Sequence, residues 1–300
     1  MQSVISGGPG TEGQLLGQSR SFIRWKAAAQ LPGKPHGVGD RRDRLRRGEG
    51  LLPPNTHQVP CPFDLHAAQR IRCARLEPVA NIICLDFDDT IVLENTARLI
   101  FERYASPSWR EFEAQYHAGR LSVEQFNAAA LETVEASRGE LQAFVAGAVS
   151  VRTGFLELLD WAHWNGWLPV VVSNGFDFYV DVVLDGLGAD RLARHAGRTS
   201  QDYRWRVTYY SPRGIALEEG FKLSYAAAFQ NSGDFVAYVG DGESDVAAAR
   251  LAQAVFARST LLEKLDGVHA PVYGFESFHD VVEVLARESE GWLQGAAVSS

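Results

Sequence analysis

Apolar runs and helical periodicities alternate along residues 81–290 of this chain. Continuous apolar runs predict three buried strands, at 82–85, 168–172 and 235–239, because a parallel strand that helices cover on both faces needs apolar side chains on both sides. Between these runs, apolar residues recur at the three- and four-residue spacings of amphipathic helices. Strands that alternate with helices predict an α/β fold with a doubly wound parallel sheet.

A helical insertion separates the first two strands. Residues 94–150 carry apolar side chains at helical spacing, and Ser122, followed by Glu124 and Gln125, is typical of a helix start. We therefore expect a catalytic core of residues 81–93 and 151–290 and a helical cap of residues 94–150 that is large enough to cover the strand tips. Candidate polar contacts of this cap with a substrate are Glu94, Asn95, Arg98, Arg120 and Arg138.

Shorter elements complete the core. The segment 204–210 alternates apolar and polar residues and predicts a further strand, and 254–257 predicts a short one. Helices are expected after each strand, the last of them over 277–285. Residues 291–300 are expected to form a loose tail.

The first 80 residues differ in composition from the rest. Gly and Pro recur, and no apolar period persists, so this segment buries too little apolar surface to offset its ordering entropy. We expect a disordered N-terminal extension without a fold of its own. Two alternatives stay open: an organelle transit peptide, since residues 1–30 contain one acidic residue, and a biological start near residues 79–81.

Charge and cysteine content limit the partners and the compartment. Residues 1–80 carry 12 Lys and Arg against 6 Asp and Glu, a net charge of +6, and residues 81–300 carry 17 against 31, a net charge of −14. An acidic core argues against nucleic acid and anionic membranes as partners. Three cysteines without paired spacing (Cys61, Cys73 and Cys84) favour a reducing compartment, and we expect a cytoplasmic protein without a membrane span or secretory signal. The oligomeric state stays open.

Polar residues follow each of the three apolar runs. The carboxyl ends of parallel strands meet at one edge of a sheet, where α/β proteins bind ligands. Carboxylates gathered there repel one another by about 4 kcal/mol per pair at roughly 4 Å, and Mg²⁺ with oxygen ligands would relieve this repulsion. In chain order the residues are Asp86, Asp88, Asp89 and Thr90, then Ser173, Asn174 and Gly175, then Gly240 and Asp241.

A lysine completes the inventory for phosphoryl transfer. Residues 81–300 contain two lysines, and one of them, Lys222, lies at an expected helix start. Carboxylates, a hydroxyl, a lysine and a cation can supply the nucleophile, the general acid and the positive charge that this reaction needs. Ser173 or Lys222 alone is compatible with an ordinary surface or capping residue. Their joint occurrence at element tips, in this order, predicts a functional site.

The ordered motifs resemble the four motifs of the haloacid dehalogenase superfamily of aspartyl-nucleophile phosphatases, over about residues 81–290. The resemblance implies a Rossmann-like core in which Asp86 attacks phosphorus and Asp88 is the general acid and base. It implies that Ser173, Asn174, Gly175 and Lys222 bind the phosphoryl oxygens, with Thr90 orienting the first motif within this phosphate site. It further implies a Mg²⁺ site formed by Asp86, Asp88 (through its backbone carbonyl), Asp241 and Asp245. The motifs are 86–90, 172–175, Lys222 and 240–245.

Within the superfamily, the insertion resembles the helical cap of the phosphoserine-phosphatase-like branch. Segments 107–109, 173–180 and 256–258 are most similar to the methionine-salvage phosphatases that act on 2-hydroxy-3-keto-5-methylthiopentenyl-1-phosphate. The chain departs from that pattern in carrying Asp89 where those enzymes have Gly, and in lacking cysteines ahead of Lys222. Phosphoserine phosphatases place a Glu near Asn95, where this chain has Glu94. These departures leave the chemistry intact and the substrate open.

We therefore expect a Mg²⁺-dependent phosphomonoester hydrolase that acts on a small phosphorylated metabolite through an aspartyl-phosphate. Alternatives within the same fold are a phosphoserine phosphatase and a phosphotransferase to a second alcohol. A non-catalytic module that binds a phosphorylated ligand is the alternative from another class. The pairing of Asp86 with Asp88 argues against this module, because a binding protein needs neither a nucleophile nor an acid.

Overall fold

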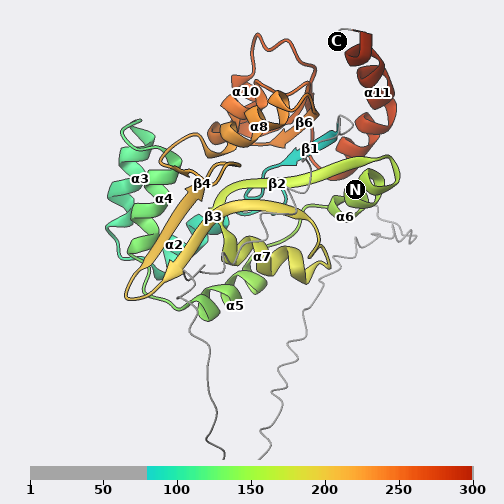
Figure 1. The fold of residues 1–300 in the computed structure, drawn as a ribbon. Coiled ribbons are helices and arrows are strands. Elements are labelled where there is room, and N and C mark those ends of the chain that lie inside the picture. Colours follow the sequence, from blue (N-terminus) through green and yellow to red (C-terminus); the bar gives the residue numbers. More distant parts are fainter. Residues whose placement is uncertain (1–79, 299–300) are drawn as a thin grey trace, which may run out of the picture. The chain divides into compact units, whose positions relative to one another are not determined.

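The computed structural model describes residues 80–298, which contain an eight-stranded sheet with helices on both faces (Figure 1). The expected N-terminal extension, with Cys61 and Cys73, lies outside the described residues. The strand order is β5-β4-β3-β2-β1-β6-β7-β8. The strands are β1 (Asn81–Leu85), β2 (Trp167–Phe176), β3 (Ala193–Gln201), β4 (Trp205–Tyr210), β5 (Ala216–Leu217), β6 (Phe235–Gly240), β7 (Ala254–Ala257) and β8 (Val272–Gly274).

The sheet is mostly parallel, as predicted. β1 lies between β2 and β6 and is parallel to both, and β3, β7 and β8 continue the parallel arrangement outward. At one edge, β4 pairs in the antiparallel sense with both β3 and β5. The predicted α/β fold class is confirmed, with this antiparallel edge as an addition.

Both faces of the central strands are buried, which explains their continuous apolar sequence. On one face, Ile83 and Leu85 belong to a core that includes side chains of α6 (Phe155–Trp164), α7 (Asp177–Gly186) and α11 (Phe278–Val298). On the other face, Ile82 and Cys84 belong to a core with α8 (Phe221–Asn231), α9 (Val246–Ala249) and α10 (Ser259–Lys264). A 3₁₀ turn, Glu243–Asp245, precedes α9.

Four helices lie between β1 and β2: α2 (Thr96–Tyr104), α3 (Trp109–His117), α4 (Val123–Glu132) and α5 (Arg138–Ala148). Ser122 and Ser137 begin α4 and α5 with capping boxes, which satisfy backbone N–H groups at each helix start. The chain enters and leaves this insertion at one place, where Val92 and Val151 form an antiparallel bridge. In Figure 1, α4 lies beside β4 and α3 packs against α4, and α5 lies beside α7.

Several elements differ from the sequence prediction. β3 was not expected, because its sequence is largely polar. β2 extends through Phe176, so Ser173, Asn174 and Gly175 are part of the strand instead of following it. α11 reaches Val298, into the segment expected to be a loose tail, because Trp292 stacks on Phe235 and packs against the core.

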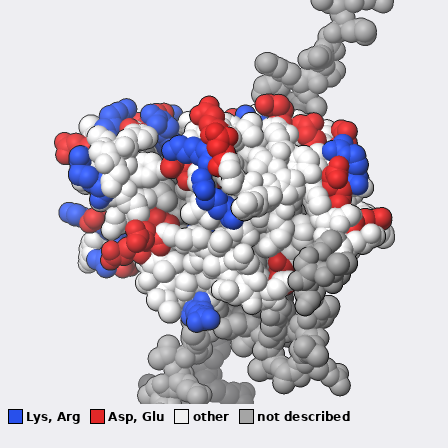
Figure 2. Space-filling model, turned by 90° about the horizontal axis from the view of Figure 1, so that it is seen from above, with Lys and Arg blue, Asp and Glu red and all other residues white. Residues whose placement is uncertain are grey.

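The surface gives no sign of an extended binding face for a polyanion on the side drawn in Figure 2. Basic and acidic side chains are interspersed there, with uncharged areas between them. Within residues 80–298, no helix combines the length and the apolar character that a membrane crossing requires.

His195 makes the stability of the fold depend on pH. This half-buried side chain of β3 stacks on Tyr225 of α8, with ring centroids 4.3 Å apart, and burial lowers the pKa of His195 from 6.5 to about 4. The unfolded chain therefore binds a proton that the folded chain excludes. We expect this contribution to stability to be complete above pH 6.5, to be lost progressively as the pH falls to about 4, and to change no further below that pH.

The comparison is between the wild type and His195→Phe, which keeps a stacked ring and cannot titrate. Urea unfolding between pH 4 and pH 7 should give a free energy of unfolding that falls less steeply for the variant. Equal slopes for the two proteins over this range would contradict the assignment.

Candidate active site

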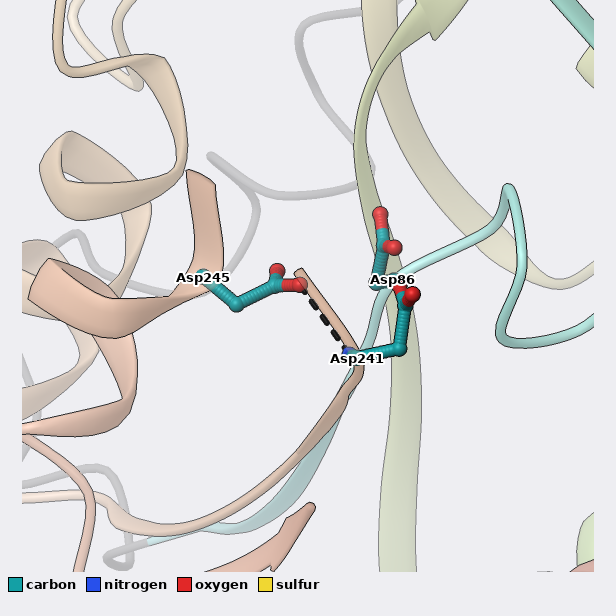
Figure 3. Close-up of side chains that lie close together, drawn as sticks. All are labelled: Asp86, Asp241 and Asp245. Carbon is teal, nitrogen blue, oxygen red and sulfur yellow. Dashed lines mark hydrogen bonds between the residues drawn. The ribbon is translucent and has the colours of Figure 1, made fainter. Parts of the chain in front are cut away.

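Two carboxylates stand side by side at the centre of the sheet edge. Asp86 directly follows β1 and Asp241 directly follows β6, and the register pairs Leu85 with Val239. Figure 3 shows both side chains next to each other, with Asp245 pointing toward them from the 3₁₀ turn. Carboxylate oxygens of Asp86, Asp241 and Asp245 lie within 4.8 Å of one another. The structure thus brings together the three side chains that the sequence proposed as metal ligands.

Asp245 is fully buried and already hydrogen-bonded through both oxygens. Its Oδ1 accepts bonds from Lys222 Nζ at 2.7 Å and from the Tyr238 hydroxyl at 2.6 Å. Its Oδ2 accepts from the backbone N–H groups of Asp241 at 3.2 Å and Gly242 at 2.9 Å. Asp245 therefore holds both the lysine and the loop that carries Asp241.

Lys222 points from the first turn of α8 at Asp86. Its Nζ lies 2.6 Å from Asp86 Oδ1, and its side chain is only 3% exposed. Burial alone would lower the pKa of Lys222, but the carboxylates of Asp245 and Asp86 outweigh this effect and raise it. The ammonium group therefore stays charged beside Asp86.

Asp88 is held away from this cluster by two donors. The Tyr179 hydroxyl donates to Asp88 Oδ2 at 2.6 Å, and the backbone N–H of Thr96, at the start of α2, donates to Oδ1 at 2.8 Å. Burial raises the pKa of Asp88, and these two hydrogen bonds oppose that effect. The sequence analysis did not identify Tyr179. Its position in an amphipathic helix predicts packing, and only the need of a buried hydroxyl for a partner hints at more.

The two residues after Asp88 shape the loop. Thr90 is fully buried, and its hydroxyl contacts carboxylate oxygens of both Asp86 and Asp241 at 3.4 Å. Asp89 adopts φ +58°, in the left-handed region that favours Gly and that Asp tolerates. Its carboxylate accepts a bond from Asn95 Nδ2 at 3.1 Å. This conformation is compatible with either Asp or Gly at this position.

The tip of β2 is buried and polar. Ser173 Oγ accepts a hydrogen bond from the backbone N–H of Gly175 at 2.9 Å. Asn174 Nδ2 donates to Glu124 Oε1 of α4 at 3.0 Å, and the Asn174 carbonyl accepts from Asn127 Nδ2 at 2.7 Å. The sequence analysis used Glu124 only as a marker of a helix start and did not name Asn127. The spacing of residues around Glu124 and Asn127 in the sequence does not indicate that either side chain binds Asn174.

A cavity of about 240 Å³ lies between the motif residues and the insertion. All of the predicted site residues except Thr90 and Asp245 line it. Of the polar residues proposed in the insertion, Asn95 and Arg98 line it, whereas Glu94, Arg120 and Arg138 do not. The insertion contributes an aromatic and apolar wall: Ala97, Phe101, Trp109, Tyr116, Val123 and Phe126. Its other polar contributions are Glu113, His117 and Asn127.

The arginine of the insertion that lines the cavity, Arg98, is paired with two acidic residues of the insertion. Arg98 Nη1 lies 2.8 Å from Glu113, and Arg98 Nε lies 3.0 Å from Glu102. Glu94 accepts a bond from the backbone of Ser150, at the place where the insertion begins and ends. The positive charge of Arg98 at the cavity wall is therefore already paired with carboxylates of the insertion.

Gly175 leaves room for the contact between Tyr179 and Asp88. A Cβ at this position would lie 2.1 Å from the Tyr179 hydroxyl and 2.9 Å from Asp88 Oδ2. Gly175→Ala should displace both groups and, with Asp88 as the general acid and base that the motifs lead us to expect, lower kcat by a factor of the order of 10², because general acid–base catalysis is typically worth 10²–10⁴. Steady-state kinetics measure the effect.

Gly147→Ala is the matched control, since a Cβ there meets nothing within 4 Å and the residue lies within α5. This variant should keep its activity. A Gly175→Ala protein with wild-type kcat would show that the alignment of Asp88 by Tyr179 does not matter for turnover.

The chain is similar in sequence to a family of hydrolases and to named phosphatases. The family model of haloacid dehalogenase-like hydrolases matches residues 83–250. A "2-hydroxy-3-keto-5-methylthiopentenyl-1-phosphate phosphatase" of Brevibacillus brevis is 25% identical over 211 residues, covering 69% of this chain and 95% of the relative. An enzyme of the same name from Bacillus cereus is 28% identical over 206 residues, covering 67% and 93%.

Solved structures show the same fold. A phosphoserine phosphatase with an analogue of its phospho-aspartyl intermediate superposes with a TM-score of 0.52 at 21% identity, covering 70% of this chain and 99% of the other. A substrate-bound phosphoserine phosphatase gives a TM-score of 0.51 at 20% identity, with the same coverage. The family match spans more than half of the chain, and its motifs meet at one edge of the sheet. This protein therefore belongs to the haloacid dehalogenase-like hydrolase family, as its ordered motifs predicted.

Proposed function

We propose that this protein is a Mg²⁺-dependent phosphomonoester hydrolase that works through an aspartyl-phosphate. The observation that carries the proposal is the pair of aspartates at the β1 tip. Asp86 lies against the ammonium group of Lys222 at 2.6 Å, while Asp88 is held separately by Tyr179. Burial raises the pKa of both carboxylates; the Lys222 ammonium opposes this effect at Asp86, whereas hydrogen bonds from Tyr179 and Thr96 oppose it at Asp88. Asp86 thus has a cation beside it and Asp88 has neutral donors, which supports different roles for the two groups.

The residues present fit Mg²⁺. The candidate ligands are all oxygens, which this hard cation prefers. Burial and the nearby carboxylate of Asp245 raise the pKa of Asp241 to about 7, which reflects the electrostatic cost of the acidic cluster. Asp86, Asp241 and the backbone carbonyl of Asp88 would hold the ion, with Asp245 supporting them because its oxygens already have donors. When bound, the ion supplies positive charge next to the phosphoryl oxygens.

The chain's own residues account for the two steps. The Asp86 carboxylate attacks phosphorus as the ester P–O bond breaks, and Asp88 gives its proton to the leaving alcohol. Asp88 then takes a proton from a water molecule that attacks the aspartyl-phosphate, so inorganic phosphate leaves and Asp86 is regenerated. Lys222, the Ser173 hydroxyl and the β2 backbone donate hydrogen bonds to the phosphoryl oxygens.

The insertion acts as a cap that recognises the leaving group. Its wall toward the cavity is aromatic, and the charge of Arg98 is balanced by Glu113 and Glu102. Such a wall suits an uncharged, partly apolar leaving group better than the zwitterionic serine of phosphoserine. Together with the names of the relatives, this supports 2-hydroxy-3-keto-5-methylthiopentenyl-1-phosphate as the substrate, with phosphoserine as the second candidate.

Substitution of the two aspartates tests the reaction. Asp86→Asn should abolish steady-state turnover of a fluorogenic phosphomonoester, because no carboxylate remains to attack phosphorus. Asp88→Asn should slow turnover by about 10²–10⁴-fold, the usual worth of general acid–base help. Wild-type protein in EDTA should be inactive and should recover when Mg²⁺ is added in excess.

Circular dichroism of each variant controls for folding, and Asp160→Asn, on α6 and away from the cavity, is a carboxylate control. Undiminished turnover by Asp86→Asn, or full activity in the chelator, would refute the mechanism. Transfer of the phosphoryl group to an added alcohol in place of water would identify the phosphotransferase alternative. Phosphate binding without any turnover would identify the non-catalytic alternative.

A substrate pair tests the cap. We expect kcat/KM for 2-hydroxy-3-keto-5-methylthiopentenyl-1-phosphate to exceed that for L-phosphoserine by at least about tenfold, the usual worth of a matched apolar group in a pocket. Tyr116→Ala, which removes part of the wall, should reduce this ratio, whereas Tyr203→Ala, at a fully exposed position, should not. A preference for phosphoserine in the wild type would reverse the choice of substrate.

A further inference from the structure

One carboxylate of the insertion is buried in the catalytic core. Glu124, in the first turn of α4, is only 4% exposed. Its Oε1 accepts hydrogen bonds from the backbone N–H of Phe221 at 2.8 Å and from Asn174 Nδ2 at 3.0 Å. A buried carboxylate is costly unless donors satisfy it, so these two bonds hold the side chain strongly in place.

The two partners of Glu124 carry opposite sides of the proposed phosphate site. Asn174 lies between Ser173 and Gly175 on β2, and Phe221 immediately precedes Lys222 in α8. We call Ser173, Asn174, Gly175 and Lys222 the phosphate cradle. Because both bonds end on the same oxygen atom, Glu124 ties the β2 side of the cradle to its α8 side.

The contact with α8 is chemically specific. The first N–H groups of a helix have no partner within the helix and carry the positive end of its dipole, so a carboxylate satisfies them well. The Phe221 N–H is such a group, and the helix that it begins is 11 residues long. With Glu124 bound there, the backbone on which Lys222 is mounted has a fixed position.

Neighbouring contacts seat the same end of α4. Ser122 Oγ donates to the Glu218 carbonyl just before α8, and Asn127, on the next turn of α4, donates to the Asn174 carbonyl at 2.7 Å. The Tyr209 hydroxyl joins this group by donating to the same carbonyl at 2.5 Å. The insertion therefore reaches the cradle through several polar contacts, and Glu124 is the one that bridges its two sides.

We propose that Glu124 is a positioning residue through which docking of the insertion completes the phosphate cradle. This inference rests on the proposed function for the identity of the cradle. It gives the insertion a part in binding the phosphoryl group as well as the leaving group. A purely structural role for Glu124 would lower stability and leave phosphate affinity and kcat/KM of the folded protein unchanged.

The experiment measures binding of inorganic phosphate by calorimetry in the presence of Mg²⁺, together with kcat/KM for a small fluorogenic phosphomonoester. Glu124→Ala removes the acceptor and should weaken phosphate binding and lower kcat/KM by about tenfold or more, the range for losing a hydrogen bond to a charged group. Glu124→Asp, one methylene shorter, should show the same direction of change. Glu124→Gln keeps an acceptor oxygen at the same reach and should restore most of both quantities.

Glu132→Ala is the matched control. Glu132 is the last residue of the same helix and contacts Arg204, outside the insertion, at 3.0 Å, but this ion pair is exposed and includes no residue of β2 or α8. We expect wild-type phosphate affinity for this variant. Thermal unfolding of each variant separates stability from binding.

The outcomes separate the inference from the proposed function. The positioning role is overturned if Glu124→Ala keeps wild-type phosphate affinity and kcat/KM. Glu124→Asp serves the same purpose if the alanine variant does not fold. Hydrolysis by the wild type would still uphold the proposed function. Weakened phosphate binding in these variants supports the role, even if the wild type hydrolyses no phosphomonoester and the proposed function fails. An equally large loss of phosphate affinity in Glu132→Ala also overturns the role, because the effect would then come from a general loosening of the insertion.

Discussion

Buried negative charge at the tips of β1 and β6 is the constraint around which the site is arranged. The parallel register places Asp86 and Asp241 side by side, and Asp245 adds a third carboxylate within 4.8 Å. Within the described residues the ammonium of Lys222 bonds to both Asp86 and Asp245 and offsets part of this charge. Burial strengthens these interactions and makes any imbalance costly. A site of this kind favours cations, and it can accept a phosphoryl group only together with positive charge.

The same stretch of backbone separates the two proposed roles of the first motif. Asp86 joins the charged cluster, and two residues later Asp88 bonds to Tyr179 and to the start of α2. The two carboxylates therefore experience different surroundings although they are close in sequence. This difference supports the proposal that one group acts as the nucleophile and its neighbour as the acid. Gly175 is part of the arrangement, because any larger residue would occupy the space of the Tyr179 hydroxyl.

The insertion contacts the site at two helix starts. The first N–H of α2 binds Asp88, and Glu124 at the start of α4 binds the first N–H of α8. Its surface toward the cavity combines an aromatic and apolar wall with a few polar side chains. The insertion thus combines an apolar wall, suited to a leaving group, with polar contacts that hold groups of the core.

The central fold and the motif residues were readable from the sequence because they depend on local patterns. Apolar runs predicted β1, β2 and β6, and the polar residues after each run identified the site edge, since parallel strands must end together. Helical spacing predicted the insertion. β3 was missed because its sequence is largely polar. It pairs with β2 through backbone hydrogen bonds, and these leave no pattern in the side chains. The length of α11 was missed because Trp292 finds its partners, Phe235 and Tyr273, only in the folded chain. Tyr179, Glu124 and Asn127 were missed for the same reason. Each acts on a residue at least 47 positions away, and a contact of that range is set by how strands and helices pack.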